Sequence, residues 1–248
     1  MKKFFYKLTI MSNIKVKAQQ YLEKDIIEQL LRPSERLVIK DLARRYSLGL
    51  SPLREAVQAL SHTGFIHYRP NHGACVAPLS MDELNSIVDF LCHQLLPKKG
   101  VAPEKENDGV VQEYQLLYHF RKFGESTKLN DPDLPSFYHI DEHLVGMFEL
   151  LIPTNKAVVV QRAIHQSLQN LRRYLRLYTI HHCQQWRRLY APSELDMVVH
   201  KAIYSARFDY RELLTTYLIN IHSVLGESMV LGSNPLFTYE SVAVSLKR

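Results

Sequence analysis

The 248-residue sequence lacks the features that mark secreted and membrane proteins. It has three cysteines, Cys75, Cys92 and Cys183, whose number and spacing fit neither a disulfide framework nor a zinc ribbon. No uncharged apolar run approaches the roughly 18 residues of a membrane span, and "LTIM" near the N-terminus is too short for a secretory signal. We therefore expect a cytoplasmic protein with no membrane partner.

Positive charge is concentrated in the first third of the chain. Residues 1–80 carry 13 Lys and Arg against 6 Asp and Glu, a net charge of +7, whereas the rest of the chain carries 18 against 19, a net charge of −1. A small basic domain joined to a near-neutral larger one is typical of a polyanion-binding head with a body that has another task. A basic surface that is merely solvated is the alternative.

The first 79 residues predict three helices. Apolar residues recur close to every 3.6 positions from 14 to 31, and "RPSERL" breaks that helix at Pro33. A short second helix follows in "VIKDLARRY". The third begins with Ser51 as the N-cap and Pro52 at the first helical position, where the missing N–H costs nothing. Its core stripe has the i, i+3, i+4, i+7 spacing and consists of Leu53, Ala56, Val57 and Leu60.

A two-stranded hairpin is predicted after the third helix. Gly64 stops the helix, and "FIHYR" and "ACVAP" flank the turn sequence "PNHG". Three short helices and a hairpin, with suitable turn residues at each junction, describe a winged helix-turn-helix.

The remainder of the chain predicts an antiparallel helical bundle, so the fold class is mainly α. Its expected helices cover about 81–96, 110–125, 135–151, 156–182, 192–207 and 210–229. We therefore expect a winged helix-turn-helix at 1–79, a helical domain at 80–232 and a C-terminal tail at 233–248.

Residues 31–84 resemble the GntR family of bacterial transcription regulators. The segments "PSERL", "DLARRY", "SPLREAVQAL" and "TGFIHYRPNHGACVAPLS" fall in register with the family pattern. The helical remainder looks like the FCD domain of the FadR-type branch, whose members are usually homodimers. The resemblance implies a bacterial, nucleoid-associated homodimer that binds double-stranded DNA and a small-molecule effector.

The third helix of such a head can lie in the major groove, with its first side chains at base edges. Arg54 is the best candidate for a bidentate contact with guanine. Ser51 and the helix-start amides suit a phosphate, and Gln58 points away from the core stripe. Further candidates are Lys40, Arg44 and Arg45 for phosphates, and His72 and Gly73 at the tip of the wing. Surface solvation and an ordinary hairpin turn are the respective alternatives.

The sequence departs from the family at the start of the third helix. "LGLSPLRE" stands where the family commonly has "VSRTPVRE", so Gly49 and Leu50 replace a Ser and a base-reading Arg. The packing stripe is retained, but the DNA sequence cannot be taken from the family.

In many FCD domains one Asp and three His hold a metal ion. Asp141, His200 and His222 match three of these positions, and Val145 stands where the first His is expected. Three ligands can still hold one divalent ion of the Zn or Ni type with water in the open positions, and His139 or His143 could substitute for the missing His. Hydrogen-bonded Asp and His residues in the core are the alternative.

Other positions bear on an effector. Leu91 and Leu95 replace a family Arg and Glu in the first helix of the bundle. Among Arg172, Arg173 and Arg176 at least one could meet an anionic effector, with Arg172 and Arg176 as our candidates, and solvated or interhelical salt-bridging roles as the alternative.

These observations favour a dimeric, sequence-specific DNA-binding regulator whose body senses a small organic acid. The alternative is a DNA-binding dimer whose body has lost effector and metal binding. We do not expect an enzyme, because no GxxxxGKS phosphate loop occurs and no nucleophile or general base accompanies Asp141 and the two His.

Overall fold

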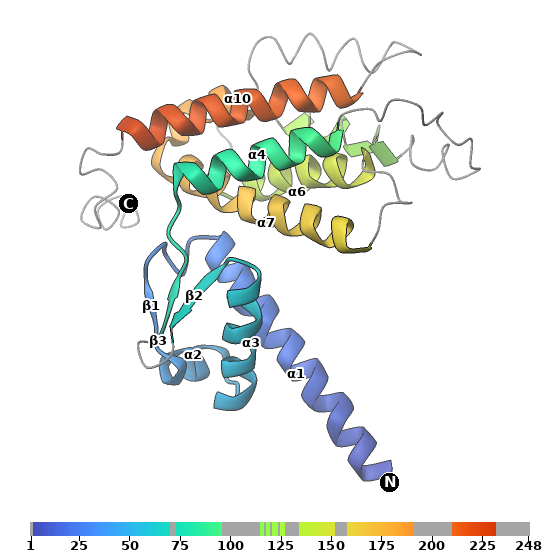
Figure 1. The fold of residues 1–248 in the computed structure, drawn as a ribbon, viewed down its shortest axis with the longest axis vertical. Helices are drawn as coiled ribbons and strands as arrows, with labels where there is room; N and C mark the ends of the chain where they lie inside the picture. Colours follow the sequence, from blue (N-terminus) through green and yellow to red (C-terminus); the bar gives the residue numbers. More distant parts are fainter. Residues whose placement is uncertain are drawn as a thin grey trace. The chain divides into compact units, whose positions relative to one another are not determined.

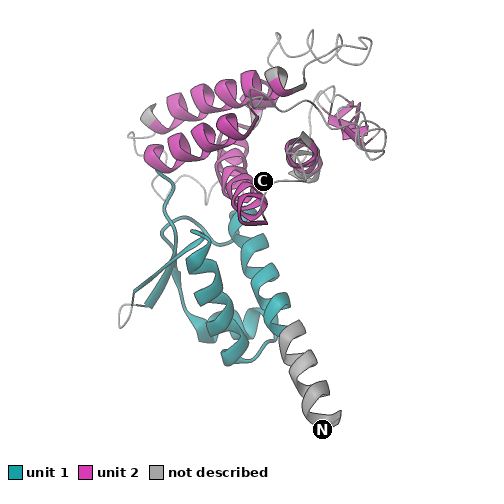
Figure 2. Cartoon of the chain, turned by 45° about the vertical axis from the view of Figure 1, so that its right-hand side comes forward, with its two compact units in different colours: residues 1–80 teal, residues 81–248 magenta. Residues whose placement is uncertain are grey.

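The structure is a computed structural model of the chain. It describes residues 2–69, 73–95, 134–151, 158–190 and 210–231, with short helical pieces between 115 and 126. The chain forms two compact units, residues 1–80 and 81–248 (Figure 2).

The first unit combines helices with a small antiparallel sheet (Figure 1). Its elements are α1 (Lys2–Ile27), β1 (Arg36–Leu37), α2 (Ile39–Tyr46), α3 (Leu50–His62), β2 (Ile66–Arg69) and β3 (Gly73–Val76). This is a winged helix-turn-helix, and the predicted fold class, mainly α with this head, is confirmed.

Helix α1 ends earlier than the sequence suggested. Gln29 adopts a left-handed conformation with φ 60°. The N–H groups of Leu30 and Leu31 both donate to the Asp25 carbonyl, at 2.9 and 3.0 Å. The helix therefore stops at Ile27, before Pro33 can act, and the prediction that Pro33 breaks it was wrong.

The start of α3 also differs from the prediction. Its first residue is Leu50, and Gly49 is the N-cap, with extended backbone and no side-chain cap hydrogen bond. Ser51 lies inside the first turn, so its assignment as the N-cap was wrong. Pro52 still costs no helical hydrogen bond there, because the first-turn N–H groups have no intrahelical acceptor. Gly64 ends the helix region with φ 79°, as predicted.

The sheet has the strand order β1-β3-β2. The predicted hairpin is present, with Ile66 opposite Val76 and Arg69 opposite Gly73. The two-residue strand β1 was not anticipated; it pairs with β3 through Arg36 and Cys75. Two residues are too few to show an alternating pattern.

The core of the first unit is apolar. Leu53, Ala56, Val57 and Leu60 are all buried, as the stripe predicted. They pack with Leu22 and Ile26 of α1 and with residues of the sheet. At roughly 1.5–3 kcal/mol for each large apolar side chain, this burial is the main stabilising contribution.

The second unit is helical in the part that the structure describes. Its elements are α4 (Met81–Leu95), α6 (Leu134–Leu151), α7 (Val158–His181), the 3₁₀ turn η1 (Cys183–Gln185), α8 (Trp186–Tyr190) and α10 (Tyr210–Leu231). Helix α4 packs on α7 and α10, and α6 packs on α7 (Figure 1).

Four predicted helices of the second unit match α4, α6, α7 and α10 within two residues at each end. The short elements η1 and α8 were not predicted, because three and five residues are too few to show a helical period. The helix expected at 192–207 and the tail at 233–248 lie outside the described residues. Across the helices that the structure describes, none is both long and apolar enough to cross a membrane.

Candidate nucleic-acid interface and the interior of the helical unit

A tight turn connects α2 to α3. Ser47 ends α2 in the left-handed region with φ 53°, and its N–H points to the carbonyls of Ala43 and Arg44. Helix α3 then starts at Leu50. The core stripe of α3 faces α1 and the sheet, whereas Leu50, Ser51, Arg54, Glu55 and Gln58 are exposed.

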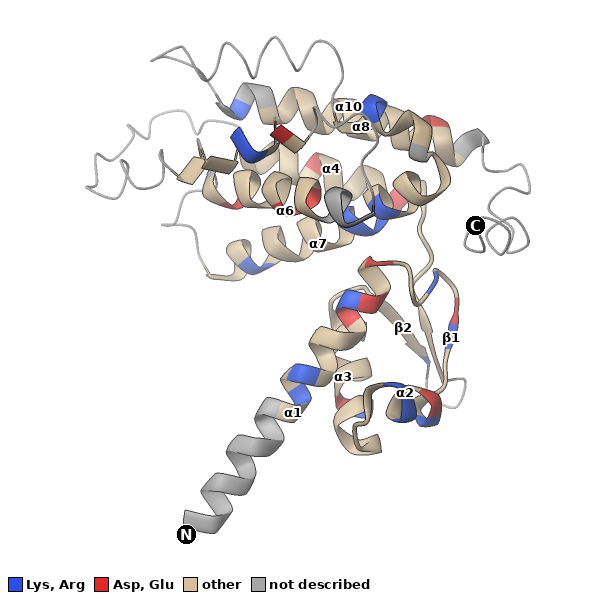
Figure 3. Cartoon of the chain, turned by 180° about the vertical axis from the view of Figure 1, so that it is seen from behind, with Lys and Arg blue, Asp and Glu red and all other residues tan. Residues whose placement is uncertain are grey.

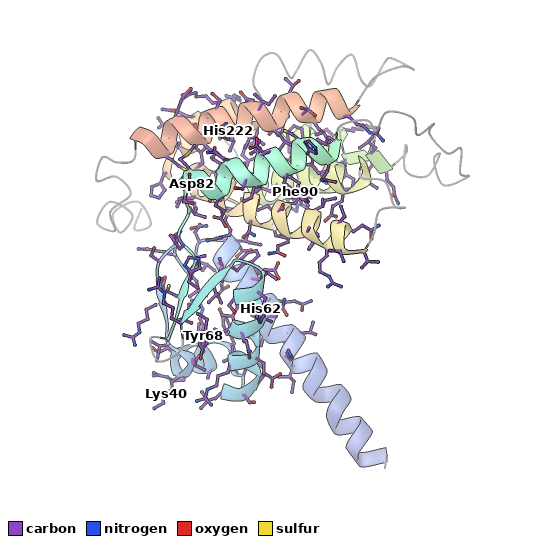
Figure 4. The ribbon with its side chains drawn as sticks, in the orientation of Figure 1. Lys40, His62, Tyr68, Asp82, Phe90 and His222 are labelled. Atoms are coloured by element: carbon purple, nitrogen blue, oxygen red, sulfur yellow. The ribbon has the colours of Figure 1, made fainter. Side chains whose placement is uncertain are left out.

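The predicted DNA-contacting residues that the structure describes are all exposed. They come from α2, α3 and β3, and they are Lys40, Arg44, Arg45, Ser51, Arg54, Gln58 and Gly73. Figure 4 shows Lys40 at the outer surface of this unit. His72 lies outside the described residues. These exposed side chains are therefore accessible to a nucleic acid.

Two of the candidate cations already have acidic neighbours, and α2 accordingly carries charges of both signs (Figure 3). Arg44 pairs with Asp41 on the surface. Arg45 lies 2.8 Å from Asp25 of α1, which also accepts a 2.6 Å hydrogen bond from the Tyr46 hydroxyl. Burial and the adjacent carboxylate raise the pKa of Tyr46 far above its usual value. Arg45 therefore ties α2 to α1, besides any role at DNA.

Lys40 and Arg54 differ from these two. Within the described residues neither makes an ion pair, so their charges face solvent. They are the cations most available for a phosphate or a base edge.

The wing carries residues that the sequence reasoning missed. His67, Tyr68 and Arg69 of β2 are all exposed. Tyr68, which is labelled in Figure 4, has 53% of its surface exposed. β2 is an edge strand that leaves both its faces open near the tip, where Arg69 faces Gly73. The run "HYR" beside a turn sequence was the available signal, since an aromatic and a cation at a wing tip suit a nucleic-acid groove.

In the second unit, Asp141 lies in a buried ionic contact. Its side chain is fully buried on α6, and Nη2 of Arg176 on α7 is 2.6 Å from its Oδ2. The Tyr190 hydroxyl donates to Oδ1. Burial raises the pKa of Asp141, and the Arg176 guanidinium and the Tyr190 hydrogen bond oppose that rise.

This arrangement does not fit a metal ion at Asp141, because a guanidinium already supplies the positive charge there. His222 is turned to another partner, with Nε2 2.6 Å from Oδ1 of Asn85 (Figure 4). Over the part of the chain that the structure describes, no three His, Cys, Asp or Glu side chains could hold a metal together. His200 lies outside that part, so the three-ligand set as a whole stays a prediction.

The two substitute ligands that we considered lie elsewhere. His143 Nδ1 is 3.1 Å from Nδ1 of His119, and His139 lies 3.8 Å from Glu142 on the same helix. Gly146 leaves room for the His119 ring, since a Cβ at that position would come within 2.6 Å of it. Burial lowers the pKa of both His119 and His143, which favours neutral rings joined by one hydrogen bond.

The candidate effector contacts are also partly engaged. Arg176 is fully buried with Asp141, and Arg172 donates a 3.1 Å hydrogen bond to Gln169. Arg173 is likewise fully buried and lies 3.9 Å from Glu83 of α4, which also accepts a hydrogen bond from Tyr174.

Apolar side chains fill the positions where the family pattern has polar ones. Leu91, Leu95 and Val145 are all buried. Internal ion pairs and apolar side chains thus occupy the region where a bound anion or metal was expected.

Comparisons with known proteins identify the head. Residues 15–76 match the model of the bacterial regulatory proteins of the gntR family. The HTH-type transcriptional repressor GlaR of Escherichia coli is 37% identical over 70 residues, which are 28% of this chain and 32% of GlaR. The N-terminal domain therefore matches the gntR family of bacterial regulatory proteins, as the sequence segments suggested.

Other similarities extend into the helical unit. The HTH-type transcriptional regulator BphR of Paraburkholderia xenovorans is 24% identical over 164 residues, or 65% of this chain and 66% of BphR. The chain thus spans just under two thirds of this relative and about a third of GlaR. The matched family and these relatives are regulators and not enzymes, in agreement with the expectation from the sequence.

Solved structures share the fold. A putative transcriptional regulator GntR from Rhodococcus sp. RHA1 superposes with a TM-score of 0.63 at 14% identity, over 86% of this chain and 97% of that one. McbR/YncC of E. coli gives a TM-score of 0.51 at 14% identity, over 87% and 98%. At these identities the likeness concerns the fold alone.

Proposed function

We propose that this protein is a sequence-specific transcriptional regulator of the gntR family that binds double-stranded DNA as a homodimer. The exposed cations Lys40 and Arg54, on the two helices of the helix-turn-helix, support this proposal most directly. A two-fold dimer would present two α3 helices to half-sites about one helical turn apart.

The proposed contacts divide by chemistry. Arg54 reads a guanine, and Lys40 holds a phosphate without reading sequence. Ser51 and Gln58 lie on the same side of α3 and add polar contacts. Arg69 and Tyr68 of the wing reach the flanking groove.

We assign the helical unit to the FCD type of the FadR-type branch, with dimerisation as its first task. Control by a small organic acid is the finer part of the proposal, and Arg172 is its best contact, because Arg176 is engaged with Asp141. An effector would act by shifting the population of dimer geometries. The second candidate function is a helical unit that only dimerises. The buried ion pair between Asp141 and Arg176 favours it, because each group already has an oppositely charged partner.

The first experiment tests the head. Duplexes selected from a randomised library by the full-length protein are titrated with Arg54→Ala and Lys40→Ala variants at several salt concentrations. Arg54→Ala should relax the preference at one base pair by about 1–3 kcal/mol. Lys40→Ala should weaken binding to all duplexes and lower the salt slope by about 0.9.

Lys24→Ala is the matched control, since Lys24 is an exposed lysine of the same unit that pairs with Glu28 on α1. It should leave both quantities nearly unchanged. An intact base preference in Arg54→Ala would refute the readout assignment, and binding without salt dependence would refute the proposed function.

The metal content of the purified protein tests whether the helical unit binds a metal ion through Asp141. Because Asp141 already faces a guanidinium, we expect the purified protein to hold no stoichiometric Zn or Ni through this residue, by elemental analysis. A stoichiometric metal that is lost in Asp141→Asn and kept in Asp89→Asn, an exposed residue of α4, would instead support the family's metal site.

A further inference from the structure

Leu50 is a large apolar side chain at the start of the helix that we assign to the major groove. It is the first residue of α3 and is 40% exposed. Its neighbours Ser51 and Arg54, in the first turns of the helix, are polar and exposed.

The core does not account for this leucine. Leu53, one turn further on, is fully buried, whereas Leu50 is absent from the apolar cluster of the first unit and from the partly buried residues packed against it. Single exposed leucines are common on protein surfaces, so exposure alone carries no meaning. The meaning comes from the position, because this side chain would be covered when α3 enters a groove.

The major groove offers few partners to such a side chain. Base edges there present hydrogen-bond donors and acceptors, together with one apolar group, the C5-methyl of thymine. A leucine cannot satisfy a donor or acceptor, so burying it against a polar edge is unfavourable. Contact with a thymine methyl removes apolar surface of both groups from water.

We propose that Leu50 is a specificity-determining residue that reads the methyl group of one thymine in each half-site, next to the base pair contacted by Arg54. This inference rests on the proposed function and extends it to the sequence that is read. It adds one T·A pair, read by an apolar contact, to the base pair that Arg54 reads by hydrogen bonds.

The experiment removes the methyl group without changing any hydrogen bond. Duplexes are selected from a randomised library by full-length wild type, and each thymine of the selected site is replaced singly by deoxyuridine. Affinities are measured by fluorescence anisotropy for wild type, Leu50→Ala and Leu50→Arg. For wild type, we expect one position per half-site at which deoxyuridine weakens binding about fourfold, the effect of one buried methyl group.

Leu50→Ala should bind the thymine and deoxyuridine duplexes equally at that position, and Leu50→Arg should change the preferred base there from thymine to guanine. Leu30→Ala is the matched control, since Leu30 is a 55% exposed leucine of the same unit outside α2 and α3. It should keep the wild-type response to deoxyuridine.

Two results would overturn the inference: no thymine whose methyl group matters to wild type, or the same methyl effect in Leu50→Ala. Either can occur while binding stays salt-dependent and selective, which leaves the proposed function standing. Failure of the protein to bind any duplex in a salt-dependent way would overturn the proposed function and this inference together.

Discussion

The interiors of the two units are built differently. In the described part of the first unit the core is apolar, and Asp25 at its border is the one buried charged residue. The helical unit buries Asp141, Arg173 and Arg176 together with Gln169, Asn170 and Thr179.

The difference affects which helices pair with one another more than it affects the net stability of each unit. Apolar burial stabilises the head without fixing particular pairs, whereas each buried charge in the body needs a partner from another helix. Buried ion pairs contribute little net stability compared with apolar residues of the same volume, but breaking one by removing a partner is costly. The helical unit should therefore depend on its buried charges as well as on its apolar packing.

The largest expected effect comes from Asp141→Ala. It leaves the Arg176 guanidinium buried without its carboxylate, which should lower the free energy of unfolding by about 3–5 kcal/mol. Trp186, the sole tryptophan, is buried in α8, so its fluorescence during denaturant unfolding reports on this unit.

Two further variants test whether the loss of stability comes from breaking the buried ion pair. Asp89→Ala, at an exposed position of α4, should change stability by less than about 0.5 kcal/mol. The double variant Asp141→Leu with Arg176→Met should recover most of the loss, because it replaces the ion pair by apolar groups. A single variant as stable as wild type would show that the contact between Asp141 and Arg176 does not matter for folding.

A somewhat smaller effect is expected from Leu53→Ala in the head. The side chain is fully buried in α3, and the cavity should cost about 3 kcal/mol. Leu50→Ala, on the same helix but exposed, should cost less than about 0.5 kcal/mol. Hydrogen exchange of the α3 amides measures both. An equal loss of stability in the two variants would contradict the assignment of Leu53 as buried and Leu50 as exposed.

The smallest effect concerns pH. Burial lowers the pKa of His119, His143 and His182 in the folded state. The unfolded chain then binds protons more readily than the folded one. Stability from this source is therefore complete above about pH 6.5 and is lost as the pH falls below that value.

The measurement is the thermal midpoint between pH 7.5 and 5.5. The midpoint of wild type should fall with decreasing pH, and His143→Gln should show a weaker fall, whereas His93→Gln, an exposed histidine of α4, should follow wild type. A pH dependence that is unchanged in His143→Gln would remove this pair as the cause.

Periodicity and turn residues predicted the winged helix-turn-helix and the four long helices α4, α6, α7 and α10 that the structure describes in the second unit. The stripe of Leu53, Ala56, Val57 and Leu60 and the stop at Gly64 act over a few residues, so periodicity and turn chemistry reveal them. The predicted end of α1 and cap of α3 were wrong by a few positions, because neither a left-handed glutamine nor a glycine N-cap without a side-chain hydrogen bond is marked by the apolar period.

The partners of the buried charged residues in the helical unit depend on how its helices pack. The resemblance matched Asp141 to a metal ligand, but the sequence could not show that Arg176 and Tyr190, 35 and 49 positions away, lie against that carboxylate. Such contacts depend on how separate helices pack, and no period along the chain encodes them. The same holds for Leu50, whose identity is visible in the sequence while its exposure is decided by the fold.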